Sequence, residues 1–197
     1  MTADKATLDF YNKEAPTYAP WSKPEGPFAW LEKFLSMAPE GRLLDYGCGG
    51  GWAAKRMLEE GRKVDAFDGS EGLASEAEAL TGLPVACHTF AEFDADAIYA
   101  GVWASFCLLH VPKAEMPANL ACIHAALAPG GLLYLGLKEG EGEERDSLDR
   151  LYVYFREDEI EALLSAAGFT EIDIRIRVDK GYDGVSVNGM HIYAARP

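Results

Sequence analysis

The chain has 197 residues, of which 49% are hydrophobic and 25% charged, which is typical of one globular domain with its own core. Its formal net charge is −14, with 18 Lys and Arg against 32 Asp and Glu. Binding to DNA or RNA depends on clustered basic side chains, and the absence of such a cluster from the sequence disfavours a nucleic-acid substrate.

Alternating strand and helix patterns fill the chain from residue 42 onward. In chain order, the predicted elements are a strand at 42–47, a helix at 51–61, a strand at 63–68, a helix at 70–82, a strand at 83–89, a strand at 100–109, a helix at 116–127, a strand at 131–137 and a helix at 156–169. In the second helix Leu73, Ala77 and Leu80 form the predicted apolar side, and Gly82 is its predicted end. The strand at 100–109 is nearly all apolar, which favours a central parallel strand buried on both faces.

The tail of the chain, residues 171–196, alternates apolar and polar residues around Gly, Asp and Asn turns. That pattern is typical of an antiparallel hairpin. Together with the strand–helix units it predicts an α/β fold, with a doubly wound, mostly parallel seven-stranded sheet and an antiparallel C-terminal strand pair. Ligands of such sheets bind beyond the carboxyl ends of the strands. Residues 1–41 and the acidic stretch 138–150 fall outside this pattern.

The cysteines and the N-terminus indicate a reducing compartment. The four cysteines are Cys48, Cys87, Cys107 and Cys122, and they form no CxxC pair. The start of the chain has no apolar signal core, and no window approaches the length of a membrane span. We therefore expect a cytoplasmic protein with reduced thiols. Its histidines do not cluster with one another or with cysteines, so no metal site is predicted.

A glycine-rich stretch, LLDYGCGGGW at 43–52, follows the first predicted strand. A phosphate-binding P-loop would need a Lys-Ser or Lys-Thr pair after Gly47, and the chain has none there. The dinucleotide fingerprint GxGxxG fails as well, because its third glycine falls on Trp52. The remaining interpretations are a loop that approaches a phosphate-free ligand and a merely tight turn.

Asp68 ends the second predicted strand, about twenty residues beyond the glycines. At that place a carboxylate can accept hydrogen bonds from both hydroxyls of a ribose. The alternative is that Asp68 only caps the next helix, a role that Ser70 could equally fill. The glycine loop and the acid at this separation together favour nucleoside binding.

Several motifs in this order resemble those of class I S-adenosylmethionine-dependent methyltransferases. They are LLDYGCGGG, AFDGS, LLHVP and ALAPGGLLYL, with the final antiparallel strand pair that distinguishes this Rossmann-like fold from dehydrogenases. The stretch from 102 to 169 is similar to the bacterial tellurite-resistance-type branch of small-molecule methyltransferases. The resemblance implies one methyltransferase domain over 1–197, with an N-terminal helical cap segment at 1–41 and the catalytic sheet at 42–197.

The resemblance also implies a set of residues around the cofactor, S-adenosyl-L-methionine. They are Tyr11, Tyr18, Asp45, Gly47, Cys48, Gly49, Asp68, Gly69, Ser70, Thr89, Phe90, Ser105 and Phe106. The loop at 45–49 would surround the methionine part, Asp68 would hold the ribose, and residues 89–90 would contact adenine. Relatives often have an acid in place of Thr89, so the chain departs from the pattern there. Phe106 could instead be plain strand packing, and the two tyrosines could be part of a helix packed on the sheet edge.

His110, after the fourth predicted strand, is the one residue well placed to act as a general base. The alternative is a capping or packing histidine in LLHVP. The place after that strand reads SFCL, which argues against the amide or base-amine acceptors that a Pro-Pro-aromatic motif would serve. The stretch 138–150 is either a loop over the acceptor site, with Lys138, Arg145 and Arg150 as contacts to an anionic or polar group, or a solvated acidic loop.

We therefore expect in-line methyl transfer from S-adenosylmethionine to a small-molecule acceptor, with no nucleic acid and no membrane as partner. The alternatives left open are an NAD-dependent oxidoreductase and a non-catalytic protein that binds S-adenosylmethionine. A monomer and a homodimer are both compatible with the sequence.

Overall fold

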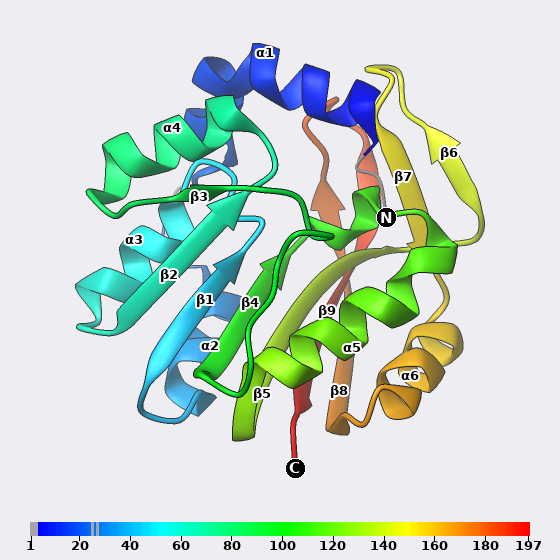
Figure 1. Ribbon diagram of the computed structural model, residues 1–197. Coiled ribbons are helices and arrows are strands. Elements are labelled where there is room, and N and C mark those ends of the chain that lie inside the picture. Colours follow the sequence, from blue (N-terminus) through cyan, green and yellow to red (C-terminus); the bar gives the residue numbers. More distant parts are fainter. Residues whose placement is uncertain (1–3, 25, 27) are drawn as a thin grey trace.

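A twisted, mostly parallel sheet runs through the middle of the molecule, and helices cover both of its faces (Figure 1). The computed structural model describes residues 4–24, 26 and 28–197. Its strands are β1 (Arg42–Tyr46), β2 (Lys63–Asp68), β3 (Ala86–Cys87), β4 (Tyr99–Ser105), β5 (Leu127–Glu139), β6 (Glu143–Arg145), β7 (Leu151–Phe155), β8 (Thr170–Lys180) and β9 (Ser186–Ala195). Its helices are α1 (Lys5–Ser22), α2 (Ala29–Met37), α3 (Trp52–Glu59), α4 (Glu71–Thr81), α5 (Met116–Ala126) and α6 (Glu157–Ala166), with short 3₁₀ turns at Leu108–His110 and Lys113–Glu115.

The strand pairing confirms the fold class predicted from the sequence. Strands β3, β2, β1, β4 and β5 are neighbours in that order and run parallel. Strand β9 pairs antiparallel with both β5 and β8, so the C-terminal strand pair closes that side of the sheet. The structure adds a hairpin of β6 and β7, which is joined to the end of β5 through Lys138 and Glu139.

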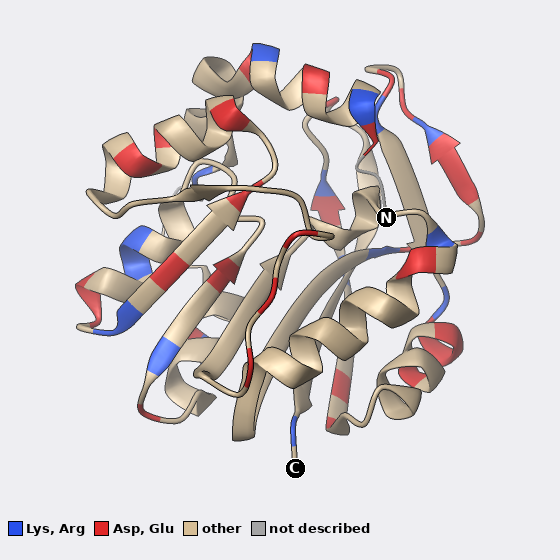
Figure 2. Cartoon of the chain, viewed as in Figure 1, with Lys and Arg blue, Asp and Glu red and all other residues tan. Residues whose placement is uncertain are grey.

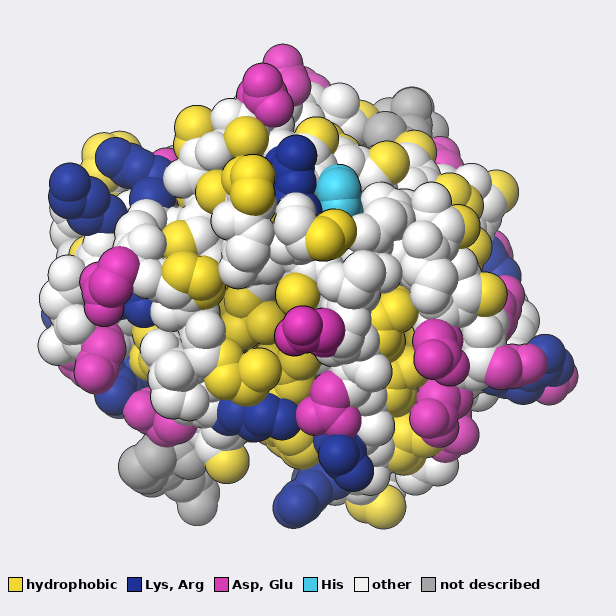
Figure 3. All heavy atoms as spheres, turned by 90° about the horizontal axis from the view of Figure 1, so that it is seen from below, with side chains coloured by type: hydrophobic (Ala, Val, Ile, Leu, Met, Phe, Trp, Pro, Cys, Tyr) yellow, Lys and Arg dark blue, Asp and Glu magenta, His cyan; other side chains and the backbone are white. Residues whose placement is uncertain are grey.

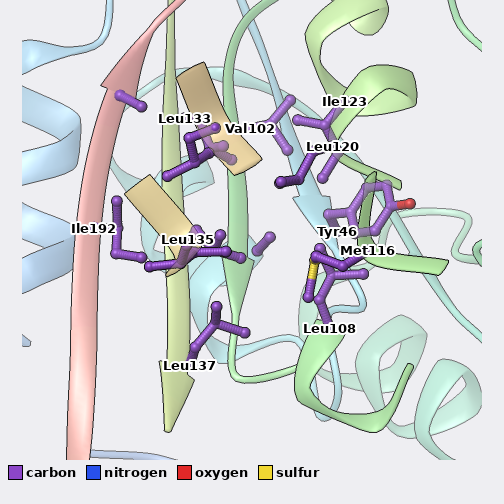
Figure 4. Packing of buried hydrophobic residues seen from close by; sticks show 14 of the residues in the cluster. Tyr46, Val102, Leu108, Met116, Leu120, Ile123, Leu133, Leu135, Leu137 and Ile192 are labelled. Carbon is purple, nitrogen blue, oxygen red and sulfur yellow. The ribbon is translucent and has the colours of Figure 1, made fainter. Parts of the chain in front are cut away.

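Side chains that alternate along β4 and β5 divide between two apolar layers, as expected for strands buried on both faces. On one face, Val102 and Leu133 lie with Ile123 of α5 (Figure 4). On the other face, Trp103 and Tyr134 stack with their ring centroids 3.7 Å apart, beneath α2 and α3. Each fully buried side chain of this size stabilises the fold by about 1.5–3 kcal/mol.

Helix α4, in the second strand–helix unit, begins and ends at residues suited to capping a helix. Ser70 caps α4, because its side-chain oxygen accepts a hydrogen bond from the Leu73 N–H at 3.2 Å. Gly82 ends the helix in the left-handed conformation, with φ of 73°. Leu73 and Ala77 are buried as predicted, whereas Leu80, in the last turn of α4, is 43% exposed.

Helix α1 lies across the top of the molecule, over the ends of the strands (Figure 1). Its Asn12 side chain accepts hydrogen bonds from Ser70 Oγ at 2.8 Å and Gly72 N at 3.1 Å, so one stretch of the helix is tied to α4. The start of the helix is tied to β7, because Thr7 Oγ1 accepts a hydrogen bond from Leu151 N at 2.9 Å. Helix α1 therefore spans the carboxyl end of the sheet between these two attachments.

Three predicted segments differ from the structure. The strand predicted at 83–89 is reduced to Ala86–Cys87, an exposed edge pair that follows a proline, Pro84. The strand predicted at 100–109 ends at Ser105, because Phe106 takes a left-handed conformation with φ of 54° and the chain turns there. The stretch 138–150 is not a simple loop, since it contains the end of β5 and the whole of β6.

Acidic segments are spread over the helices and loops around the sheet and outnumber the basic ones (Figure 2). Figure 3 looks onto the opposite end of the molecule from α1, where acidic and basic side chains are interspersed among apolar atoms. Among the helices that the structure describes, none combines the length and the apolar character needed to cross a membrane.

Candidate functional site

A cavity of about 160 Å³ opens beneath α1, where β1, β2 and β4 end. Its lining includes every cofactor-contact residue predicted from the sequence except Ser70. These residues are Tyr11, Tyr18, Asp45, Gly47, Cys48, Gly49, Asp68, Gly69, Thr89, Phe90, Ser105 and Phe106, and His110 lines it as well. We call this space the first cavity.

The glycines after β1 have two different structural roles. Gly47 and Gly49 have φ of 70° and 55°, a conformation that favours glycine, and a Cβ on Gly49 would meet no atom within 4 Å. Gly49 therefore presents bare backbone to the first cavity. A Cβ on Gly50 would instead lie 2.7 Å from the Cβ of Ala19, so this glycine lets α1 approach the loop closely.

Asp68 is held at the end of β2 by backbone N–H groups. Its Oδ2 accepts a hydrogen bond from Gly49 N at 2.8 Å, and its Oδ1 accepts one from Ser70 N at 2.8 Å. Each carboxylate oxygen can accept a further hydrogen bond, and the side chain lines the first cavity. Burial raises the pKa of this carboxyl, although the backbone hydrogen bonds oppose that rise. The alternative role of helix cap falls to Ser70 instead.

Asp45, near the end of β1, is 2% exposed and also lines the first cavity. Its Oδ2 accepts a hydrogen bond from Ala54 N at 2.9 Å, in the first turn of α3. Burial, together with the nearby Asp68 charge, raises its pKa to about 7 despite that hydrogen bond. A cation placed in the cavity would favour the ionised form of both carboxyls.

Thr89 and Phe90, after β3, form another part of the cavity wall. Phe90 stacks on Tyr46, with ring centroids 5.0 Å apart and planes inclined by 4°. The Thr89 hydroxyl donates to Glu92 Oε2 at 2.8 Å, and the Thr89 N–H donates to the same oxygen at 2.8 Å. An acid therefore lies three residues after the position where relatives often carry one.

The end of β4 separates the first cavity from a second one. Ser105 and Phe106 line both. A Cβ on Gly136 of β5 would lie 3.0 Å from the Phe106 ring, so that glycine makes room for the ring. The neighbouring thiol, Cys107, donates to the Tyr46 carbonyl at 2.9 Å, and burial raises its pKa well above the ordinary range, which makes it a poor nucleophile.

The second cavity, of about 280 Å³, lies beside the first and shares seven lining residues with it. The shared residues are Tyr11, Tyr18, Ser22, Trp52, Ser105, Phe106 and His110. Its remaining wall includes Lys138 of β5, Tyr152 of β7 and Tyr182 of the turn between β8 and β9, together with Trp21 of α1. Two molecules, one bound in each cavity, could therefore contact each other at the shared wall.

His110 lies in that shared wall, and its hydrogen bonds fix the tautomer of its ring. Its Nδ1 is 2.6 Å from the Leu151 carbonyl oxygen, which can only accept, so Nδ1 carries the proton. Its Nε2 therefore accepts from the Tyr11 hydroxyl at 2.8 Å, and Arg150 Nη1 donates to that hydroxyl oxygen at 3.3 Å. Burial, with the Arg150 and Lys138 charges nearby, lowers the pKa of His110 to about 4, so the imidazole is neutral at pH 7.

The three cations that the sequence analysis placed over the acceptor site separate in the structure. Lys138 and Arg150 line the second cavity. Arg145 does not, because it is occupied by an ion pair with Asp4 at 2.7 Å. Trp21, Tyr152 and Tyr182 are not predicted from the sequence, because their positions in the cavity wall depend on long-range packing.

A family model described as a methyltransferase domain matches residues 21–173. No curated protein matches the chain.

Many solved structures share the fold. The Burkholderia thailandensis 1,6-didemethyltoxoflavin-N1-methyltransferase, solved with 1,6-didemethyltoxoflavin and S-adenosylhomocysteine, is 24% identical with a TM-score of 0.73, over 95% of this chain and 85% of that one. The Haemonchus contortus phosphoethanolamine N-methyltransferase 2, solved with phosphomonomethylethanolamine and S-adenosylhomocysteine, is 17% identical with a TM-score of 0.76, over 97% of this chain and 60% of that one. A SAM-dependent methyltransferase from Methanosarcina mazei is 19% identical with a TM-score of 0.73, over 86% and 98%. At these identities the likeness establishes the fold.

Proposed function

The chain belongs to the methyltransferase domain family, and on that premise we propose that it transfers a methyl group from S-adenosylmethionine to a small-molecule acceptor. The first cavity is the proposed cofactor site, and the second is the proposed acceptor site. Three of the solved structures with this fold are described with S-adenosylhomocysteine bound, which supports the choice of cofactor.

The observation that carries the proposal is the set of charges around the first cavity. Its described lining holds four acidic side chains, those of Asp4, Asp45, Asp68 and Glu115, and neither Lys nor Arg. Asp4 is neutralised by Arg145 at 2.7 Å, which leaves the other three to set the charge of the wall. A nucleotide phosphate would be repelled there, whereas the sulfonium and ammonium groups of S-adenosylmethionine are cations. This wall therefore fits a phosphate-free, cationic nucleoside and disfavours the dinucleotide of an oxidoreductase.

The individual residues fit the parts of that cofactor. Asp68 would accept hydrogen bonds from the ribose hydroxyls with its remaining lone pairs, because Gly49 and Ser70 already hold it in place. Gly49 would let the methionine part lie against the backbone, close to Asp45. Gly47 instead makes room for Cys107, because a Cβ on Gly47 would lie 2.6 Å from the Cβ of Cys107. Thr89 and Phe90 would contact the adenine. Ser70 acts through Asp68 and α4 rather than by contact.

When bound, S-adenosylmethionine supplies a methyl group on an already activated sulfonium leaving group. The residues of the chain then have to align the acceptor in line with that methyl group and exclude water. Tyr11, Tyr18 and Trp52 are suited to this task, because their rings belong to both cavity walls.

His110 is the proposed general base, and it acts together with Tyr11. Nε2 of the neutral imidazole is the basic nitrogen of the pair, and the Tyr11 hydroxyl now occupies it. A proton from the acceptor would reach Nε2 directly if it displaced that hydroxyl, or through the Tyr11 oxygen. With a pKa of about 4, His110 is a weak base, which suits an acceptor whose reacting atom is already acidic.

The domain organisation, family branch and cellular location are proposed from the sequence. We propose a single methyltransferase domain, close to the tellurite-resistance-type branch, because the motifs from 102 to 169 follow that pattern. A cytoplasmic location is proposed from the four free cysteines. The oligomeric state, monomer or homodimer, can be measured by sedimentation.

Calorimetric titration with S-adenosylhomocysteine tests the proposed cofactor. Wild-type protein should bind one molecule per chain, and Asp68→Ala should weaken binding by at least about tenfold because it loses charged hydrogen bonds to the ribose. Asp65→Asn is the matched control, since Asp65 lies on the same strand but is occupied by Arg42 and Tyr99 and lines neither cavity. Wild-type protein that binds NAD and not S-adenosylhomocysteine would overturn the proposal.

A further inference from the structure

Lys138 is a buried ammonium group that faces the second cavity. It lies on β5, is 8% exposed and lines that cavity. Among the described residues, no carboxylate lies within ion-pairing distance of its Nζ, and no hydrogen bond from Nζ is present. Its close polar contact is with the face of the Tyr152 ring, whose centroid is 3.6 Å from Nζ.

Such an arrangement is unusual for a structural lysine. Burying an ammonium group without a hydrogen-bonding partner is unfavourable, and a cation–π contact compensates only part of the lost hydration. Burial also lowers the pKa of Lys138, although the charges of Asp183, Asp146 and Glu144, none of which forms an ion pair with Nζ, oppose that shift. By contrast, Lys33 and Lys113, which also lie over aromatic rings, each have a carboxylate partner, Asp173 and Glu159 respectively.

The second cavity is lined by more basic than acidic side chains, although the protein as a whole is strongly acidic. In a chain of net charge −14, the described wall of this cavity holds Lys138, Arg150 and Lys180 against a single acid, Asp179. Arg150 is neutralised by Asp146 at 2.6 Å. Asp179 keeps its negative charge, because His191 Nε2 at 3.1 Å balances it only when the imidazole is protonated. The wall therefore still carries more positive than negative charge, with Lys138 and Lys180 against Asp179.

The rest of the wall is largely aromatic. Tyr18, Trp21 and Tyr182 contact one another in edge-on or tilted pairs, with centroids 4.9 to 5.6 Å apart. They come from α1 and from the turn between β8 and β9, and all three line the second cavity. Rings of this kind bind flat, unsaturated molecules through their faces and edges.

We propose that the methyl acceptor is a small aromatic or conjugated molecule that carries an oxyanion, and that Lys138 Nζ binds this oxyanion. The proposal rests on the proposed function, because it identifies the second cavity as the acceptor site. The shared chemistry is that of a carboxylate or phosphate on a planar body. Lys138 determines specificity: it holds the acceptor in place, and the reacting atom faces the shared wall with the first cavity.

Calorimetry on protein saturated with S-adenosylhomocysteine tests the proposal. The anionic probes are benzoate and phenyl phosphate, which separate the two kinds of oxyanion, and the neutral probes are benzamide and phenol. At least one anion should bind at least about tenfold more tightly than its neutral counterpart. Lys138→Met should remove that difference, whereas Lys138→Arg should retain most of it. Lys113→Met is the matched control, because it also removes an ammonium from an aromatic ring but lies outside both cavities.

A second measurement uses only wild-type protein, in case Lys138→Met does not fold. The rate of reductive methylation of each lysine is mapped by mass spectrometry, with and without the probes. Benzoate or phenyl phosphate should slow the reaction of Lys138 several-fold and leave Lys113 unchanged. Anions that bind no better than the neutral probes, or that leave Lys138 unprotected, would overturn the inference. Failure of S-adenosylhomocysteine to bind would overturn the proposed function instead, and the probes can then be titrated into the unliganded protein.

Discussion

Asp45→Asn should make the unliganded protein more stable at alkaline pH and at the same time weaken cofactor binding. Asp45 is buried, and its pKa rises from 3.8 to about 7 on folding. Because the folded state holds this proton more tightly than the unfolded state, wild-type stability falls as the pH rises from about 4 to about 7. The loss approaches about 4 kcal/mol above pH 7, since each pKa unit corresponds to about 1.4 kcal/mol. Asparagine keeps an oxygen for the Ala54 N–H and does not titrate.

The assay is urea unfolding of wild-type protein and of Asp45→Asn at pH 5 and pH 8, without cofactor. Any cost of the asparagine amide is the same at both pH values, so the pH dependence isolates the carboxyl group. The stability of the variant relative to wild type should be greater at pH 8 than at pH 5 by about 2.5 kcal/mol. Asp96→Asn, at an exposed position, is the control and should change stability by less than about 0.5 kcal/mol at either pH.

An equal stability difference at pH 5 and pH 8 would refute this reasoning, because it would mean that Asp45 is ionised in the folded state throughout that range. The same carboxyl links cofactor affinity to pH. A cationic ligand favours ionised Asp45, so affinity should fall by up to about tenfold for each pH unit below 7, and this dependence should weaken in Asp45→Asn, where Asp68 still titrates in the cavity wall.

Three further substitutions test other parts of the structure. Gly49→Val should abolish detectable S-adenosylhomocysteine binding in calorimetry, because the side chain would enter the first cavity. It should also lower the free energy of unfolding by about 1–3 kcal/mol, because valine is strained in the left-handed backbone conformation. Unchanged binding would contradict the placement of the cofactor. Asn12→Ala should lower the free energy of unfolding by about 1–2 kcal/mol and speed hydrogen exchange in α1, because the bonds to Ser70 and Gly72 are lost; unchanged exchange would show that α1 is held by other contacts. Arg150→Met should lower stability in urea by about 3–5 kcal/mol, because Asp146 is left largely buried without its partner; a loss below about 1 kcal/mol would show that this carboxylate is solvated.

Local patterns predicted the sheet and many of the residues that line the first cavity. The apolar run before Gly47 forms β1, and Gly82 ends α4 as expected, because burial and backbone conformation at these positions depend on neighbours in the sequence. Asp68 and the glycines meet because parallel strands bring their carboxyl ends to one edge of the sheet. Motif order and topology together therefore specify the part of the first cavity at the ends of β1, β2 and β4, but not the part that Trp52, Glu115 and Asn119 contribute.

The acceptor side could not be predicted in the same way. Strand β6 arises in an acidic stretch that resembles a solvated loop, because it pairs with β7, which itself gains partners from β5 and α1. The bond between Tyr11 and His110 joins residues 99 positions apart. The isolation of Lys138 is a property of what surrounds it in space, and nothing near it in the sequence signals it.

A crystal structure with S-adenosylhomocysteine bound would test the proposed cofactor site most directly. We expect the nucleoside in the first cavity, with both ribose hydroxyls within hydrogen-bonding distance of the Asp68 carboxylate. We also expect the sulfur to face the wall shared with the second cavity, near Tyr11 and Phe106. A nucleoside bound elsewhere, or a sulfur directed away from the second cavity, would contradict this placement.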